Sequence, residues 1–248
     1  MFHHNWGLCV VALLGIVLSQ RSSAAPVVTT DSQAAPAAGG ASFTPTYAPS
    51  STDLINGRAP SASNGDFALE LAGGLPALTD GVYGTITQPG GAPDRTHGAF
   101  ATAGNTAGST VTYTLNTAAN PLGFDVSSIV VYGGWNDNGR DQQMYQVLYS
   151  TTANPTSFIN LASVDFNPTV AANTQSATRT TLTDPAGRLA TGVAALQFNF
   201  LNPENGYTGY AEIDVLGSAT VPEPAGCALA CLGAAVLLTR RRGGATRR

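Results

Sequence analysis

The sequence predicts an all-β domain, an antiparallel two-sheet sandwich of the jelly-roll type, from three observations. Several short stretches alternate apolar and polar residues, which is typical of half-buried strands. Dipeptides that favour tight turns separate these stretches. Between the two ends of the chain, no stretch has the periodicity of an amphipathic helix. About eight short strands without helices predict two packed sheets. The alternative is an immunoglobulin-like sandwich, although its Cys…Trp…Cys pattern is absent.

The N-terminal residues have the composition of processing and linker segments. An apolar stretch from Trp6 to Leu18 precedes the small residues Ser22-Ser23-Ala24, so residues 1–24 are expected to be a secretory signal peptide. Residues 25–41 are rich in Ala, Pro, Gly, Thr and Ser and have hardly a large apolar residue. They are expected to be a disordered linker. The domain is therefore expected to span residues 42–219.

The clearest strands follow a period of two. Val111, Tyr113 and Leu115 alternate with threonines, and Leu196, Phe198 and Phe200 alternate with Gln197 and Asn199. Further strands are expected at residues 67–71, 128–132, 144–150, 158–166, 178–183 and 211–216. The turn dipeptides are Asn56-Gly57, Asn64-Gly65, Asp80-Gly81, Asn138-Gly139 and Asn205-Gly206.

Charge and cysteine content limit what the domain can bind. Residues 25–220 contain five arginines, no lysine and fourteen acidic residues, which gives a formal charge of −9. Such a surface repels nucleic acid and anionic membranes, and it suits calcium or neutral sugars. The same residues contain no cysteine, so the domain has no disulfide and depends on its core, with or without a bound ion.

One loop concentrates the residue types that bind sugars. Trp135 follows Gly133-Gly134 and precedes Asn136, Asp137 and Arg140. An indole in a loop can present a flat apolar face to a sugar ring, and the three polar side chains can hydrogen-bond to its hydroxyls. The alternative is that Trp135 folds back to plug the end of the sandwich and that the Asn-Asp-Asn-Gly run serves only as a turn.

No catalytic arrangement is found. His97 is the only histidine outside the N-terminal segment, so it cannot form a metal cluster or a triad alone. The carboxylates are scattered, and no glycosidase pair or phosphate-binding glycine motif can be picked out. We therefore expect a protein that is not an enzyme.

Four segments resemble parts of discoidin, or coagulation-factor type C, domains of the galactose-binding-like superfamily. The first, Gly139 to Thr151, resembles the arginine-containing loop that leads into a Tyr-x-Val strand. The second, Gly209-Tyr210-Ala211-Glu212-Ile213-Asp214-Val215-Leu216-Gly217, resembles the terminal strand. Leu54-Ile55-Asn56-Gly57 and Leu78-Thr79-Asp80-Gly81 resemble the early Asp-Gly turn. The chain lacks the framing cysteines that the family often has and the tryptophan that often follows this turn.

The resemblance implies a structural calcium ion. Many members hold calcium between the loop after the Asp-Gly turn and the glutamate of the last strand, which correspond here to Asp80 and Glu212. Backbone carbonyls of residues 81–85 would supply further oxygens, as a hard cation with six to eight ligands requires. The alternative is that Asp80 is a turn residue and Glu212 points outward from its strand.

The C-terminal residues form three unlike segments. Val221, Pro222, Glu223 and Pro224 precede fifteen residues, 225–239, that are apolar or small, and Arg240, Arg241 and Arg242 follow. As a helix this run would be about 22 Å long, short of a hydrocarbon core of about 30 Å. Residues 221–248 resemble the PEP-CTERM sorting domain. This resemblance implies export, transient inner-membrane anchoring, cleavage by an exosortase-type membrane protease, and release to the surface or matrix of a Gram-negative-type bacterium. The alternative is a buried C-terminal helix.

Together these features predict an exported, non-enzymatic surface or matrix protein whose sandwich binds extracellular polysaccharide. The first alternative is a structural matrix protein without a specific ligand. The second is an extracellular glycan-active hydrolase.

Overall fold

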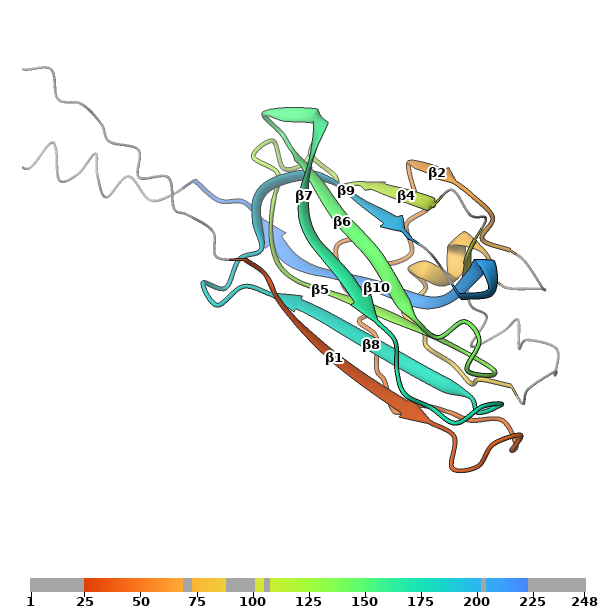
Figure 1. The fold of residues 1–248 in the computed structure, drawn as a ribbon. Helices are drawn as coiled ribbons and strands as arrows, with labels where there is room; N and C mark the ends of the chain where they lie inside the picture. Colours follow the sequence, from red (N-terminus) through yellow and green to blue (C-terminus); the bar gives the residue numbers. More distant parts are fainter. Residues whose placement is uncertain (1–24, 69–72, 88–100, 105–107, 202–203, 223–248) are drawn as a thin grey trace, which may run out of the picture.

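The computed structural model describes residues 25–68, 73–87, 101–104, 108–201 and 204–222. These residues form ten β-strands and two short 3-10 turns, Leu75–Leu78 and Glu204–Gly206 (Figure 1). No helix within these ranges is long and apolar enough to cross a membrane. The expected signal peptide, His97 and residues 223–248 of the expected sorting tail lie outside the described residues. The strands are β1 (Val27–Ala34), β2 (Ala62–Asn64), β3 (Ala101–Gly104), β4 (Ser109–Thr114), β5 (Phe124–Trp135), β6 (Gln143–Thr151), β7 (Asn154–Phe166), β8 (Ser176–Thr183), β9 (Ala190–Phe200) and β10 (Tyr207–Ala219).

The strands form two antiparallel layers. The first has the order β1-β8-β5-β10-β3, and the second has the order β2-β4-β9-β6-β7. A short pairing of Phe124 in β5 with Val193 in β9 joins the layers at one corner. The predicted all-β antiparallel sandwich is therefore confirmed.

The main core lies between the two layers and follows the alternation seen in the sequence. Val111 pairs with Phe198 and Tyr113 pairs with Leu196, and all four side chains are buried. The intervening Thr112 and Thr114 lie on the outer face, where side chains remain at least partly exposed. Burial of the apolar row fixes the register, because a slip by one residue would turn the whole row to solvent.

A second apolar cluster lies on the outer face of the first layer. Val130 and Tyr132 of β5 and Ala211 of β10 point away from the main core and are covered by Tyr47 and Tyr83. Phe43 and Ile86 pair with each other across this cover. The first layer is therefore buried on both faces where the segments around residues 43–47 and 83–86 cross it.

The expected disordered linker is wrong for its central part. Val27–Ala34 forms β1, which pairs with β8 over all eight of its residues (Figure 1). All of these residues but Gln33 are exposed, so backbone pairing rather than burial stabilises the strand. The absence of large apolar residues did not exclude a strand, because the run Val27-Val28-Thr29-Thr30 has high β-propensity. The folded domain therefore begins before residue 42.

The strand expected at residues 67–71 is not seen in its described part. Phe67 and Ala68 are not in a strand, and residues 69–71 lie outside the described residues. The Phe67 side chain is nonetheless buried in the main core, with its ring 6.0 Å from that of Phe200. Its apolar character therefore reflects core packing of a loop residue.

Candidate functional site

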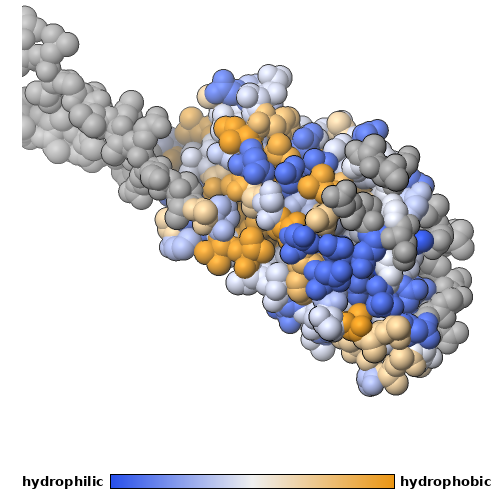
Figure 2. All heavy atoms as spheres, in the orientation of Figure 1, coloured by the Kyte–Doolittle hydropathy of each residue, from blue (hydrophilic) through white to orange (hydrophobic). Residues whose placement is uncertain are grey.

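Three connections meet at one end of the sandwich. They are the β5–β6 connection, which begins after Trp135, the β7–β8 connection, which begins after Phe166, and the β9–β10 connection, which leads into Tyr207. The strand pairings Trp135 with Ser176 and Gln143 with Phe166 place these connections side by side. Figure 2 shows hydrophilic residues gathered at this end, where β6 and β7 meet the connections. We call these connections the loop end.

Trp135 does not present an open face. Its side chain is only 6% exposed and packs in the second apolar cluster. The Arg140 guanidinium carbon lies 4.9 Å from the centre of the indole ring and 5.4 Å from that of the Tyr207 ring. The structure thus agrees with the alternative in which Trp135 plugs the end of the sandwich. The indole supports Arg140, and these contacts hold the cation in place.

Asn136, Asp137 and Arg140 are brought together, each partly exposed. The Asp137 Oδ1 atom accepts a hydrogen bond of 2.8 Å from the Gly139 backbone N–H, as in an Asx turn. The Gly209 backbone N–H donates to the Arg140 carbonyl oxygen at 3.0 Å, which ties the loop to β10. The Arg140 side chain therefore projects from an anchored backbone.

A pair of carboxyl groups lies beneath this loop. Glu204 Oε2 accepts hydrogen bonds from the backbone N–H groups of Asp141 at 3.0 Å and Gln142 at 3.1 Å. Burial is the main cause that raises the pKa of Asp141 to about 7, and the nearby Glu204 charge adds to it. Glu204 therefore joins the β9–β10 connection to the start of β6.

Of the two expected calcium ligands, Asp80 is exposed, and its Oδ1 atom accepts a hydrogen bond of 2.9 Å from the Val82 backbone N–H, as its alternative as a turn residue predicts. The turn that follows Asp80 contacts Glu212. The Gly81 backbone N–H, in the turn that follows Asp80, donates to Glu212 Oε2 at 2.7 Å. Glu212 is fully buried, so the alternative in which it points outward is wrong. The pKa of Glu212 is raised to about 9, mainly by burial. Neighbouring negative charges raise it further, and Asp80 contributes the most among them.

Several buried carboxylate oxygens lie near Glu212. Buried oxygens without a hydrogen-bond partner include Glu212 Oε1, Asp214 Oδ1 and Asp53 Oδ2. Within the described part of the chain, no group of three or more His, Cys, Asp or Glu residues is arranged to hold a metal. A calcium ion at Asp80 and Glu212 would therefore depend on backbone carbonyls for most of its ligands, as expected from the sequence.

Three site residues were missed by the sequence analysis. Asp141 was seen only as part of a motif, and Glu204 and Tyr207 flank the Asn205-Gly206 turn. Their role depends on contacts between the β5–β6 and β9–β10 connections, which are about sixty residues apart in the chain. The only local signal was an aromatic residue directly after a turn dipeptide.

Comparisons with known proteins give weak likenesses. No protein-family model matches the sequence, and no curated protein matches it. Among solved structures, an F5/8 type C domain from Bacteroides fragilis is similar, with 15% identity, 47% of this chain and 69% of that chain covered, and a TM-score of 0.33. The Clostridium perfringens module CpGH89CBM32-5, solved in complex with GalNAc-β-1,3-galactose, has 13% identity, covers 62% of this chain and 92% of its own, and has a TM-score of 0.38. The two-sheet assignment rests on this chain's own strand pairing.

Proposed function

We propose that this chain is an exported, non-enzymatic protein whose galactose-binding-like sandwich binds neutral extracellular polysaccharide at the loop end. The observation that carries the proposal is the position of Arg140, whose guanidinium lies over the rings of Trp135 and Tyr207. A guanidinium held on aromatic faces offers N–H donors in a fixed geometry, which suits sugar hydroxyls. Asn136 and Asp137 add polar groups beside it. The formal charge of −9 favours a neutral glycan over an acidic one.

Glycan-array binding of residues 25–220 tests this proposal. The segment starts at residue 25 because β1 belongs to the fold. Arg140→Ala is expected to lower retention roughly tenfold or more, because hydrogen bonds from a charged donor contribute about 1.5–3 kcal/mol. Arg188→Ala is the matched control, since Arg188 pairs with Asp125 at the opposite end of β5.

Three results would contradict the proposal. A folded segment that retains no glycan would favour the structural matrix protein without a specific ligand. Equal losses with Arg140→Ala and Arg188→Ala would show that retention does not depend on the loop end. Turnover of chromogenic glycosides by the same protein would instead favour the hydrolase.

Calcium is proposed as a structural ion held by Asp80, Glu212 and carbonyls of residues 81–85. Support comes from the 2.7 Å contact that joins the Asp80-Gly81 turn to Glu212 and from the unpartnered Glu212 Oε1 atom. When bound, calcium would neutralise the buried carboxylate and hold the turn on β10. It has no role in a reaction.

We also propose that the tail directs export and sorting through an exosortase-type membrane protease. Support comes from the order of its segments, and from Val221 and Pro222, which are exposed after the end of β10. Removing residues 221–248 is expected to abolish surface or matrix delivery. Replacing Arg240, Arg241 and Arg242 with alanine should reduce it, while the same change at Arg247 and Arg248 is the control. Unchanged delivery without the tail would refute the sorting role.

A further inference from the structure

Among the described strands, four form the edges of the two layers, and three of them carry features that block pairing with another chain. β2 and β3 have only three and four residues. β7 contains Pro155 and Asp165, and its register with β6 shifts twice. Short strands, proline, charge and bulges are the usual means by which proteins protect sheet edges. β1 has eight residues, a continuous register with β8, no proline and no lysine.

The outward polar groups of β1 can be assigned from its bonds to β8. The Ala35 N–H donates to the Gln175 carbonyl, and Thr29 Oγ1 donates to the Thr181 carbonyl at 3.5 Å. Odd-numbered residues therefore direct their backbone groups toward β8. Because these directions alternate along a strand, Val28, Thr30 and Ser32 direct their N–H and C=O groups away from the sheet. All three residues are exposed.

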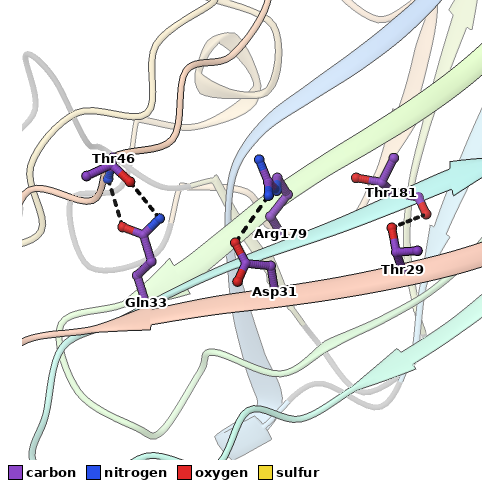
Figure 3. Close-up of polar contacts among 6 residues, drawn as sticks. All are labelled: Thr29, Asp31, Gln33, Thr46, Arg179 and Thr181. Carbon is purple, nitrogen blue, oxygen red and sulfur yellow. Dashed lines mark hydrogen bonds and ion pairs between the residues drawn. The ribbon is translucent and has the colours of Figure 1, made fainter.

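β1 is held firmly although its side chains bury little. Gln33 accepts a hydrogen bond from the Thr46 N–H at 2.8 Å and donates one to Thr46 Oγ1 at 3.0 Å (Figure 3). Asp31, the only charged residue of the strand, pairs with Arg179 at 3.2 Å. The edge is therefore preformed and locally neutral, in a domain whose formal charge is −9.

We propose that β1 is an interaction surface for a second copy of this chain, which pairs with it through its own β1 in antiparallel orientation about a two-fold axis. Only residues with outward backbone groups can exchange hydrogen bonds, so even-numbered residues pair with even-numbered ones. Centring on Thr30 places Thr30 opposite the partner's Thr30 and Val28 opposite the partner's Ser32. Asp31 then lies opposite the partner's Thr29.

The register centred on Asp31 is disfavoured by charge. Shifting the centre by one residue toward the C-terminus places Asp31 directly opposite the partner's Asp31, and like charges in that position are destabilising. The Thr30-centred register forms about six backbone hydrogen bonds. It joins the first layers of the two copies into one continuous sheet. A self-complementary contact of this kind closes as a dimer.

The mass of the full chain in mild detergent, measured by light scattering over a range of concentrations, tests the proposal. The unmodified chain and the control Thr30→Val are expected to reach twice the monomer mass. Thr30→Pro removes an outward N–H but spares the bonds to β8, so it is expected to halve that mass. Ser32→Lys should do the same because an edge lysine opposes pairing. If circular dichroism shows that Thr30→Pro has unfolded, the mass of the Ser32→Lys variant tests the proposal instead.

Cysteine cross-linking tests the register separately. Thr30→Cys places two cysteines in a hydrogen-bonded pair with Cα atoms about 5.5 Å apart, within reach of a disulfide. Mass spectrometry should identify cross-linked peptides that contain position 30 and distinguish them from those of Cys9, Cys227 and Cys231. Ser32→Cys is the matched control, because its counterpart is the partner's Val28, and no cross-link is expected.

Some results would overturn the proposal. The first is that the unmodified chain stays monomeric at every concentration. The second is that neither Thr30→Pro nor Ser32→Lys changes the dimer mass. The second result would assign association to the C-terminal tail or to another surface.

Discussion

Trp135 illustrates how burial changes the role expected for a single residue. An indole that binds sugar directly could be removed with little loss of stability, but this one is 6% exposed and packs with Tyr132 and Ala177. Arg140 lies over the same ring. The loop end therefore depends on Trp135 for its shape.

At the residue scale, Trp135→Ala is therefore expected to destabilise the domain. Truncation of a buried aromatic side chain costs about 3–5 kcal/mol. Trp135→Phe should cost less because it keeps an apolar ring in the cluster. Chemical denaturation of both variants measures the difference. A Trp135→Ala variant as stable as the unmodified domain would contradict the buried position.

A second residue-scale prediction concerns Asp141, whose pKa is raised to about 7 by burial, with the Glu204 charge adding to it. Because the folded state favours the protonated form, stability is greatest below the unfolded pKa of about 4 and falls as pH rises toward 7. One such group changes the free energy of unfolding by at most about 1.4 kcal/mol per pH unit. Asp141→Asn should flatten this dependence.

Denaturation of both forms between pH 4 and pH 8 measures this effect. Asp165→Asn serves as a control at an exposed position of the same end. An Asp141→Asn variant with an unchanged pH dependence would rule out Asp141 as the titrating group.

At the scale of elements, β1 and β9 contribute to stability in different ways. None of the side chains of β1 belongs to either apolar cluster, whereas β9 supplies Leu196, Phe198 and Phe200 to the main core. A backbone ladder on an edge adds hydrogen bonds, each with a net value of about 0.5–1.5 kcal/mol. Apolar burial between two layers is the larger contribution.

Deleting residues 25–34 is therefore expected to leave a folded sandwich with a lower free energy of unfolding. Phe198→Ala in β9 should cost about 3–5 kcal/mol by itself. Near-ultraviolet circular dichroism and denaturant titration compare the two variants. Complete unfolding on removal of β1 would show that the edge strand is essential to the fold.

At the scale of the whole molecule, the proposed calcium ion would join the turn after Asp80 to β10. Calcium at a hundredfold excess over its dissociation constant should stabilise the folded chain by about 2.7 kcal/mol. A chelator should remove this gain, which a thermal melt detects. Identical melts in calcium and chelator would contradict the proposed ion.

Glu212→Gln separates the ion from the buried charge. The amide oxygen can still accept from the Gly81 N–H, but the charge that burial disfavours is gone. In chelator the variant should be at least as stable as the unmodified chain. In calcium it should show no gain, while Asp66→Asn, a change at a loop aspartate that bonds the Ala68 N–H, should keep the gain.

The sequence by itself determined the sandwich, because alternation along Val111–Leu115 and Leu196–Phe200 leaves only one face of each strand to bury. The resemblance to discoidin domains also predicted that Asp80 and Glu212 lie close together, and the structure places the Asp80-Gly81 turn against Glu212. The strand alternation is local and is written within a few consecutive residues, whereas the contact with Glu212 was expected only from the resemblance.

The tertiary structure alone decided the rest. β1 is a strand because β8 presents a free ladder to it, and no pattern within residues 25–41 encodes that partner. Trp135 is buried in the cluster that contains Tyr47 and Tyr83, whose chain segments are far from it in sequence. Local alternation fixes which side chains can be buried, but only long-range packing decides which exposed strand is paired and which loop residue is covered.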